Sequence, residues 1–130
     1  MKILTKPSDI RQAIKDIKPS HVAVAFLGDG WDEYLCSWDL TDVVLSPTVG
    51  SNPKAIELLM QEDELGHENV HFLDDLHAKI YIGKNKALLG SCNLSRNGMS
   101  DNGLREAAVL IEDEEKIKEL RIVFDQYKKS

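Results

Sequence analysis

The sequence lacks any long hydrophobic run. Its longest uninterrupted apolar stretch covers residues 22–27, whereas a membrane-spanning helix needs about 20 apolar residues. The first residues also lack the apolar core and cleavage site of a secretory signal peptide. We therefore expect a cytoplasmic protein that makes no stable association with membranes.

Cysteine is scarce, because the chain holds only Cys36 and Cys92. Two thiols without a secretory signal are expected to be free and reduced. The histidines form no metal-binding pattern either, since His71 and His77 are six residues apart and no cysteine or carboxylate arrangement completes four ligands. We therefore expect no disulfide, no metal and no cofactor.

Internal repeats and low-complexity linkers are also absent from the 130 residues. A chain of this length can bury one substantial core. Its composition, with 42% hydrophobic and 29% charged residues, is typical of a globular protein. The sequence therefore predicts a single domain over residues 1–130.

The net charge of −6 is unevenly distributed. Residues 77–105 contain five basic residues and one acidic residue, which gives this window a charge of +4 and leaves −10 for the remainder. An evenly acidic protein would repel a polyanion. The basic window suits a phosphate-bearing ligand, and a chance cluster of solvated lysines is the alternative interpretation.

The spacing of apolar residues predicts helices and strands that alternate along the chain. Helical spacing recurs in residues 10–17, 31–38, 53–60 and 117–127. Short apolar runs typical of strands occupy residues 21–27, 43–45, 70–73, 77–82, 87–93 and 104–111. Asp9 and Asp113 are the expected N-caps of the first and last helices. This order predicts an α/β fold with a mixed, largely parallel central sheet and helices on both faces.

Trp31 and Trp38 belong to an aromatic stripe with helical spacing. Such a stripe usually packs against a core or a subunit surface. A platform on which nucleobases stack is the alternative interpretation.

The residues with useful chemistry gather in two neighbouring segments. His77 and Lys79 share one face of an alternating strand, and Ser91 and Asn93 share a face of the expected return strand. A three-residue hairpin loop would place Lys79 opposite Ser91 and His77 opposite Asn93. A two-residue loop would place Lys79 opposite Gly90 and scatter the polar groups over both faces. We predict the three-residue loop.

These residue types suit the hydrolysis of a phosphodiester. Attack on phosphorus accumulates negative charge, which cations and hydrogen-bond donors stabilise, and the leaving group needs a general acid. Lys79, Ser91 and Asn93 are suitable donors. A histidine such as His77 can act as the nucleophile and form a covalent phosphohistidine.

His77-x-Lys79 followed by Gly90-Ser91-x-Asn93 resembles the signature of the phospholipase D superfamily. This superfamily includes phospholipases, lipid synthases, small bacterial nucleases and restriction-enzyme catalytic domains. The resemblance implies an α/β layout and a metal-independent, two-step phosphodiesterase. One histidine is then the nucleophile, and a second histidine, from a paired copy of the motif, is the general acid.

The resemblance also assigns roles to individual residues. It implies catalytic roles for His77, Lys79, Asn93 and Glu106, and phosphate binding by Lys79, Ser91 and Asn93. Glu106 matches the position at which nuclease-like members carry an acidic residue that orients the histidine. No position in this pattern calls for a metal ligand.

The sequence departs from the signature in two places. Lys84 stands where the family usually has an aspartate, five residues after the lysine, and the spacing to Gly90 is one residue shorter. Some nuclease-like members also lack this aspartate, so its loss favours the nuclease branch. The remaining alternative is a hairpin whose polar face is merely solvated.

Only one copy of the motif is present, although the chemistry needs two histidines. The resemblance therefore implies a homodimer with a two-fold axis through a shared site. We expect an endonuclease that acts on DNA or RNA. The alternatives are a lipid phosphodiesterase or phosphatidyl transferase, and a non-catalytic dimeric domain that binds phosphorylated ligands.

Overall fold

The computed structural model describes residues 1–25, 35, 39–46, 53–61, 65, 67–91 and 106–130. The elements are β1 (Lys2–Leu4), α1 (Pro7–Ile17), β2 (His21–Val24), β3 (Asp42–Leu45), α2 (Pro53–Met60), η2 (His67–Asn69), β4 (Val70–Phe72), β5 (Lys79–Ile82), β6 (Ala87–Gly90), β7 (Ala108–Ile111) and α4 (Glu114–Lys129). Of the predicted helix over residues 31–38, the structure describes only Leu35. Both cysteines lie outside the described residues.

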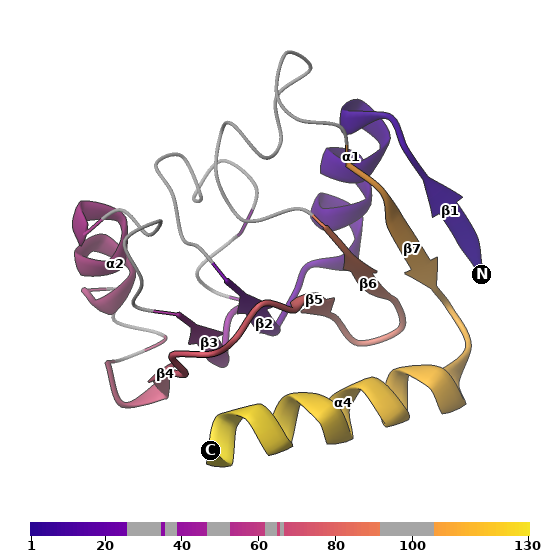
Figure 1. The fold of residues 1–130 in the computed structure, drawn as a ribbon. Helices are drawn as coiled ribbons and strands as arrows, with labels where there is room; N and C mark the ends of the chain where they lie inside the picture. Colours follow the sequence, from indigo (N-terminus) through magenta and orange to yellow (C-terminus); the bar gives the residue numbers. More distant parts are fainter. Residues whose placement is uncertain (26–34, 36–38, 47–52, 62–64, 66, 92–105) are drawn as a thin grey trace.

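The described strands form one seven-stranded sheet in the order β1-β7-β6-β5-β2-β3-β4. Helix α4 covers one face, and α1 and α2 lie on the other (Figure 1). The α/β class with helices on both faces is confirmed. The sheet is mixed, but it is mostly antiparallel rather than largely parallel, because only β2–β3 and β3–β4 are parallel pairs. One reason is that β5 and β6 are joined by a tight turn, which permits only antiparallel pairing.

Alternate residues along the strands supply two separate cores. Val22, Leu45 and Tyr81 face α1 and α2, whereas Ala23 and Ile80 face α4. Because both faces of the central strands are covered, their residues are buried without a polar alternation. This arrangement explains why these strands are short continuous apolar runs in the sequence.

The predicted inner faces of the outer helices are confirmed. The buried positions of α1 are Ile10, Ala13, Ile14 and Ile17. In α4 the buried positions are Ile117, Leu120 and Phe124, and Tyr127 is half-buried. The side chain of Asp113 caps α4 by accepting a hydrogen bond from the backbone of Glu115 at 3.2 Å.

Two expectations at the N-terminal end need correction. Asp9 does not cap α1, because the helix begins at Pro7 and Lys6 is the N-cap residue without a side-chain hydrogen bond. Proline suits the first helical turn, since its missing N–H would have no partner there. The sequence pattern also missed β1, in which only Leu4 is buried and which is too short to show a period.

The predicted register of the β5–β6 hairpin is wrong. Lys79 pairs with Gly90, and the backbone of Gly83 donates to the carbonyl of Lys86 at 2.9 Å. The loop therefore has two residues, and Ser91 does not lie opposite Lys79. Burial could not discriminate between the two registers, since every residue of β5 is buried.

A charged cluster joins β2, β3, β4 and the last turn of α4. The carboxylate of Asp42 lies 3.2 Å from His71 Nε2, 3.3 Å from Lys128 Nζ and 3.8 Å from His21 Nε2. The other ring nitrogen of His21, Nδ1, is 2.7 Å from the Ser20 hydroxyl. These contacts attach the end of α4 to the parallel part of the sheet.

His21 should make folding sensitive to pH. Burial lowers the pKa of His21 below its ordinary value of 6.5, and the nearby Asp42 carboxylate opposes this shift only in part. As the pH falls through about 6.5, the unfolded chain binds a proton that the folded chain resists, so the free energy of unfolding falls. We expect His21→Gln to make this fall less steep, as measured by chemical denaturation between about pH 8 and pH 5. Parallel curves for the two proteins would contradict this assignment.

Candidate active site

Four of the expected site residues, His77, Lys79, Ser91 and Glu106, lie at one end of the sheet. His77 precedes β5, Ser91 directly follows β6, and Glu106 precedes β7. Gly90 pairs with Lys79 on one side and with the first residue of β7 on the other. At this end of the sheet the parallel strands β2 and β3 terminate, which is where open α/β sheets commonly bind ligands. Asn93, the fifth expected residue, lies outside the described residues.

His77 and Lys79 contact each other directly. Lys79 Nζ is 3.2 Å from His77 Nε2, and the lysine side chain is only 7% exposed, whereas His77 is exposed. A lysine ammonium has no acceptor, so Nε2 is the acceptor of this contact when Lys79 is charged. The pair places an exposed imidazole in contact with a buried lysine.

Ser91 and Glu106 form a second pair. The Ser91 hydroxyl donates a hydrogen bond to the Glu106 carboxylate, and the backbone of Ala107 donates to the same hydroxyl at 3.0 Å. The expected contact of Glu106 with His77 is not among the hydrogen bonds of the described residues. In this structure Glu106 orients Ser91 instead.

The glycine before Ser91 has a packing reason. A Cβ on Gly90 would lie 2.7 Å from the Ala107 carbonyl oxygen and 2.8 Å from the Ala108 Cβ. Real Cβ atoms do not approach so closely. Glycine at this position therefore lets β6 and β7 approach each other beside Lys79.

The segment leading to His77 is attached to the end of β3. The backbone of Leu73 donates to the Leu45 carbonyl at 3.0 Å, and the hydroxyl of Ser46 donates to the Asp74 carbonyl at 3.2 Å. Ser46 is fully buried. Sequence reasoning missed Ser46 as a residue that positions the site. Its signal was a polar residue directly after a buried strand.

The basic window does not form one patch around the site. Lys84 and Lys86 belong to the hairpin turn, at the other end of β5 from His77. Position 84, where the family usually has its aspartate, is therefore remote from the candidate site in this chain. Of the lysines in the window, only Lys79 lies at the site, and the two arginines of the window lie outside the described residues.

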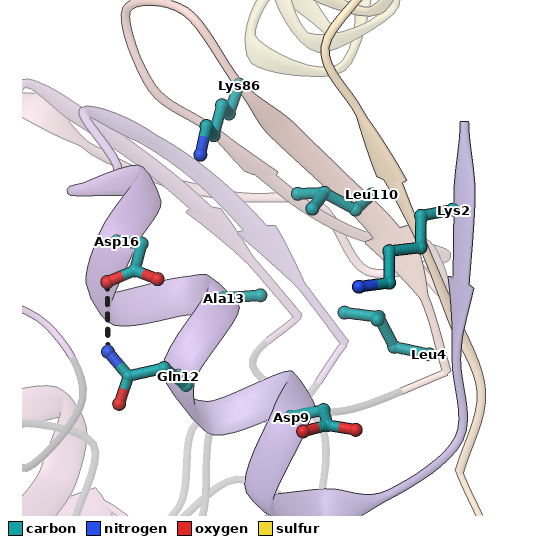
Figure 2. A pocket seen from close by; sticks show the side chains of 8 residues that line it. All are labelled: Lys2, Leu4, Asp9, Gln12, Ala13, Asp16, Lys86 and Leu110. Atoms are coloured by element: carbon teal, nitrogen blue, oxygen red, sulfur yellow. Dashed lines mark hydrogen bonds between the residues drawn. The ribbon is translucent and has the colours of Figure 1, made fainter.

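Lys86 instead lines a cavity of about 210 Å³ away from the candidate site, between α1, the strands β1 and β7, and the hairpin turn before β6. Figure 2 shows its amine on the sheet side together with that of Lys2, opposite the carboxylates of Asp9 and Asp16 on α1. Charges of both signs line this cavity, so it offers no net attraction for a phosphate.

The part of the chain that the structure describes has neither a cluster of metal ligands nor a membrane-spanning helix. No three His, Cys, Asp or Glu side chains there are grouped in a way that could hold a metal ion. No helix there has the length and hydrophobicity that crossing a bilayer requires.

Comparison with known proteins gives one family match and several similar structures. Residues 1–128 match the family described as "Cardiolipin synthase, PLD-like domain", and no curated protein matches. NucT from Helicobacter pylori has a TM-score of 0.75 and 17% identity, over 99% of this chain and 95% of that protein. Nuc from Salmonella typhimurium, a phospholipase D family member, has a TM-score of 0.68 and 12% identity, over 97% and 93%.

A third similar structure is TrmBL2, an archaeal chromatin protein described with a novel mode of DNA binding. Its TM-score is 0.55 at 12% identity, and the match covers 97% of this chain but 50% of that protein. At these identities the three structures establish a shared fold.

Proposed function

Since the chain belongs to the phospholipase D superfamily of phosphodiesterases, we propose that it is a metal-independent nuclease that cleaves DNA or RNA through a covalent phosphohistidine. The observation that carries the proposal is the contact of 3.2 Å between Lys79 Nζ and His77 Nε2, at the same end of the sheet as Ser91 and Glu106. The similarity to NucT and Nuc supports a nuclease within this superfamily.

In the proposed first step, a ring nitrogen of His77 attacks phosphorus. The N–P bond forms, the P–O bond to the leaving group breaks, and a second, protonated histidine gives its proton to the leaving oxygen. Lys79 and Asn93 stabilise the negative charge on the phosphate oxygens. Substrate must draw the Lys79 ammonium away from His77 Nε2, which frees the lone pair of that nitrogen for attack.

In the second step, water hydrolyses the phosphohistidine. An O–P bond forms and the N–P bond breaks, while the second histidine, now neutral, accepts the proton of the water. The chain has one copy of the motif, so we propose that His77 of a second subunit is this acid and base. Ser91, held by Glu106, is the proposed further contact to phosphate.

Cleavage in the presence of EDTA tests the proposal. We expect the protein to cut single-stranded DNA, plasmid DNA or RNA with excess chelator, because a histidine and a lysine supply the nucleophile and the positive charge. Light scattering on the same preparation should give the mass of two chains. A protein that is monomeric and inert toward all nucleic acids would contradict the proposal.

A lipid phosphodiesterase or phosphatidyl transferase is the second candidate, because the matched family is described by a cardiolipin synthase. Turnover of phosphatidylglycerol or phosphatidylcholine vesicles without cleavage of nucleic acid would favour it. Binding of nucleic acid without turnover would favour a non-catalytic phosphate-binding dimer. The similarity to TrmBL2, a chromatin protein described as binding DNA, supports this alternative. A cytoplasmic location remains a prediction from the sequence.

A further inference from the structure

A second cavity, of about 270 Å³, adjoins His77. One wall is the segment that leads into β5, and the other is the last turn of α4. His77 is shared between this cavity and the candidate active site. A group attached to a phosphate at His77 would therefore be near the cavity.

The walls of the cavity are apolar and polar in similar measure. They include Leu73, Leu76, Ala78 and the half-buried Tyr127, all of which pack on the core beneath α4. Among the residues that the structure describes, no lysine or arginine lines the cavity, and Asp75 supplies a carboxylate. Such walls disfavour a phosphate and favour a neutral group that carries hydrogen-bond donors.

The size of the cavity restricts the group further. Pockets for complete small-molecule ligands usually measure about 300–1,000 Å³. A cavity of about 270 Å³ suits a single ring system and is too small for the two long chains of a diacylglycerol. Tyr127 offers an aromatic side chain on which a flat ring can stack.

The α4 wall of this cavity is held in place independently of any ligand. Lys128, the neighbour of Tyr127, lies with its Nζ 3.3 Å from the Asp42 carboxylate. The ring of Phe124, one turn earlier, meets His21 edge-on at 5.2 Å between centroids. These contacts reduce the conformational entropy that Tyr127 would lose on binding a ring.

We propose that this cavity is a subsite for one unpaired nucleobase of the substrate, with Tyr127 as its stacking surface and Asp75 as an acceptor for base N–H groups. This inference rests on the proposed nuclease function and adds a substrate requirement to it. A base inside a duplex is paired and stacked, so it must be unpaired to enter.

The test compares a single-stranded oligonucleotide with a strand of equal length in which every residue is abasic. Stacking on an aromatic side chain contributes about 1–3 kcal/mol per base, so Tyr127→Ala should lower kcat/KM for the base-bearing strand roughly 5- to 150-fold. The variant should cleave the abasic strand at the wild-type rate. The wild type should therefore prefer the base-bearing strand over the abasic strand. Tyr127→Phe should retain this preference, and Tyr127→Leu, which keeps apolar packing, should lose it.

Gln126→Ala is the matched control, since this exposed residue of the same turn does not line the cavity. It should cleave both strands as the wild type does.

Equal losses of kcat/KM on both strands in Tyr127→Ala and Tyr127→Leu would indicate a structural role for Tyr127 and overturn the subsite. Cleavage of both strands at equal rates by the wild type would overturn the subsite and leave the nuclease intact. If neither strand is cut, the nuclease proposal fails, and the subsite then stands only if Tyr127→Ala weakens binding of the base-bearing strand alone.

Discussion

His77→Ala should lower the rate of phosphodiester cleavage by at least about 10⁴-fold. In a shared dimeric site this substitution removes both the nucleophile and the histidine that protonates the leaving group. Alanine cannot form the covalent intermediate, so raising the substrate concentration should not restore the rate. Initial rates on a single-stranded oligonucleotide with EDTA provide the measurement.

His71→Ala is the matched control for this experiment. His71 is another histidine of the same region, but it contacts Asp42 at 3.2 Å at the opposite end of the sheet from the candidate site. We expect this variant to cleave at nearly the wild-type rate. If His77→Ala kept a tenth of the activity or more, His77 could not be the nucleophile.

Mixed dimers extend the test to the shared site. After subunit exchange in an equimolar mixture of wild type and His77→Ala, about a quarter of the dimers contain two intact chains. If both histidines are needed, activity per wild-type chain should fall to about half of its value before mixing. Unchanged activity per wild-type chain would mean that one His77 is sufficient.

Lys79→Met should lower kcat/KM by about 10²–10³-fold while the protein stays folded. The ammonium of Lys79 contacts His77, and its removal withdraws positive charge from the proposed phosphate position. The lysine side chain is 7% exposed, and methionine fills a similar volume without a charge to bury. Burying a charge costs free energy, and the methionine variant no longer has this cost.

Thermal unfolding and steady-state kinetics on the same sample separate the two effects. We expect an unchanged or higher Tm together with the loss of activity. Lys79→Arg keeps the charge in a bulkier group, so it should retain more activity than Lys79→Met. A fall in Tm that accounts for the lost activity would assign Lys79 a structural role.

Several local features could be predicted from the sequence, because neighbouring residues produce them. The buried face of α1 follows from Ile10, Ala13 and Ile14 at helical spacing, and the start of α4 follows from Asp113. The grouping of Lys79 with His77 also follows from local geometry, since side chains two residues apart share a strand face.

Features that depend on pairing between distant segments could not be predicted. A three-residue hairpin loop would gather the polar groups on one face, but the observed register instead brings Gly90 opposite Lys79. The two pairs of polar groups still lie at the same end of the sheet, because His77 and Ser91 lie beyond the ends of their strands. The partner of Glu106, the strand β1 and the mostly antiparallel sheet also required the tertiary structure.

The sequence by itself determined the phosphodiesterase family, the helix faces and the candidate residues, since motif identity and periodicity are local properties. The tertiary structure decided that Lys79 is buried against His77, that Ser91 turns to Glu106, and that the last turn of α4 closes a cavity beside the histidine. The physical reason is that both faces of the sheet are covered. Apolar burial is then satisfied in either register, and close backbone approach at glycines, together with contacts between distant elements, selects the one observed.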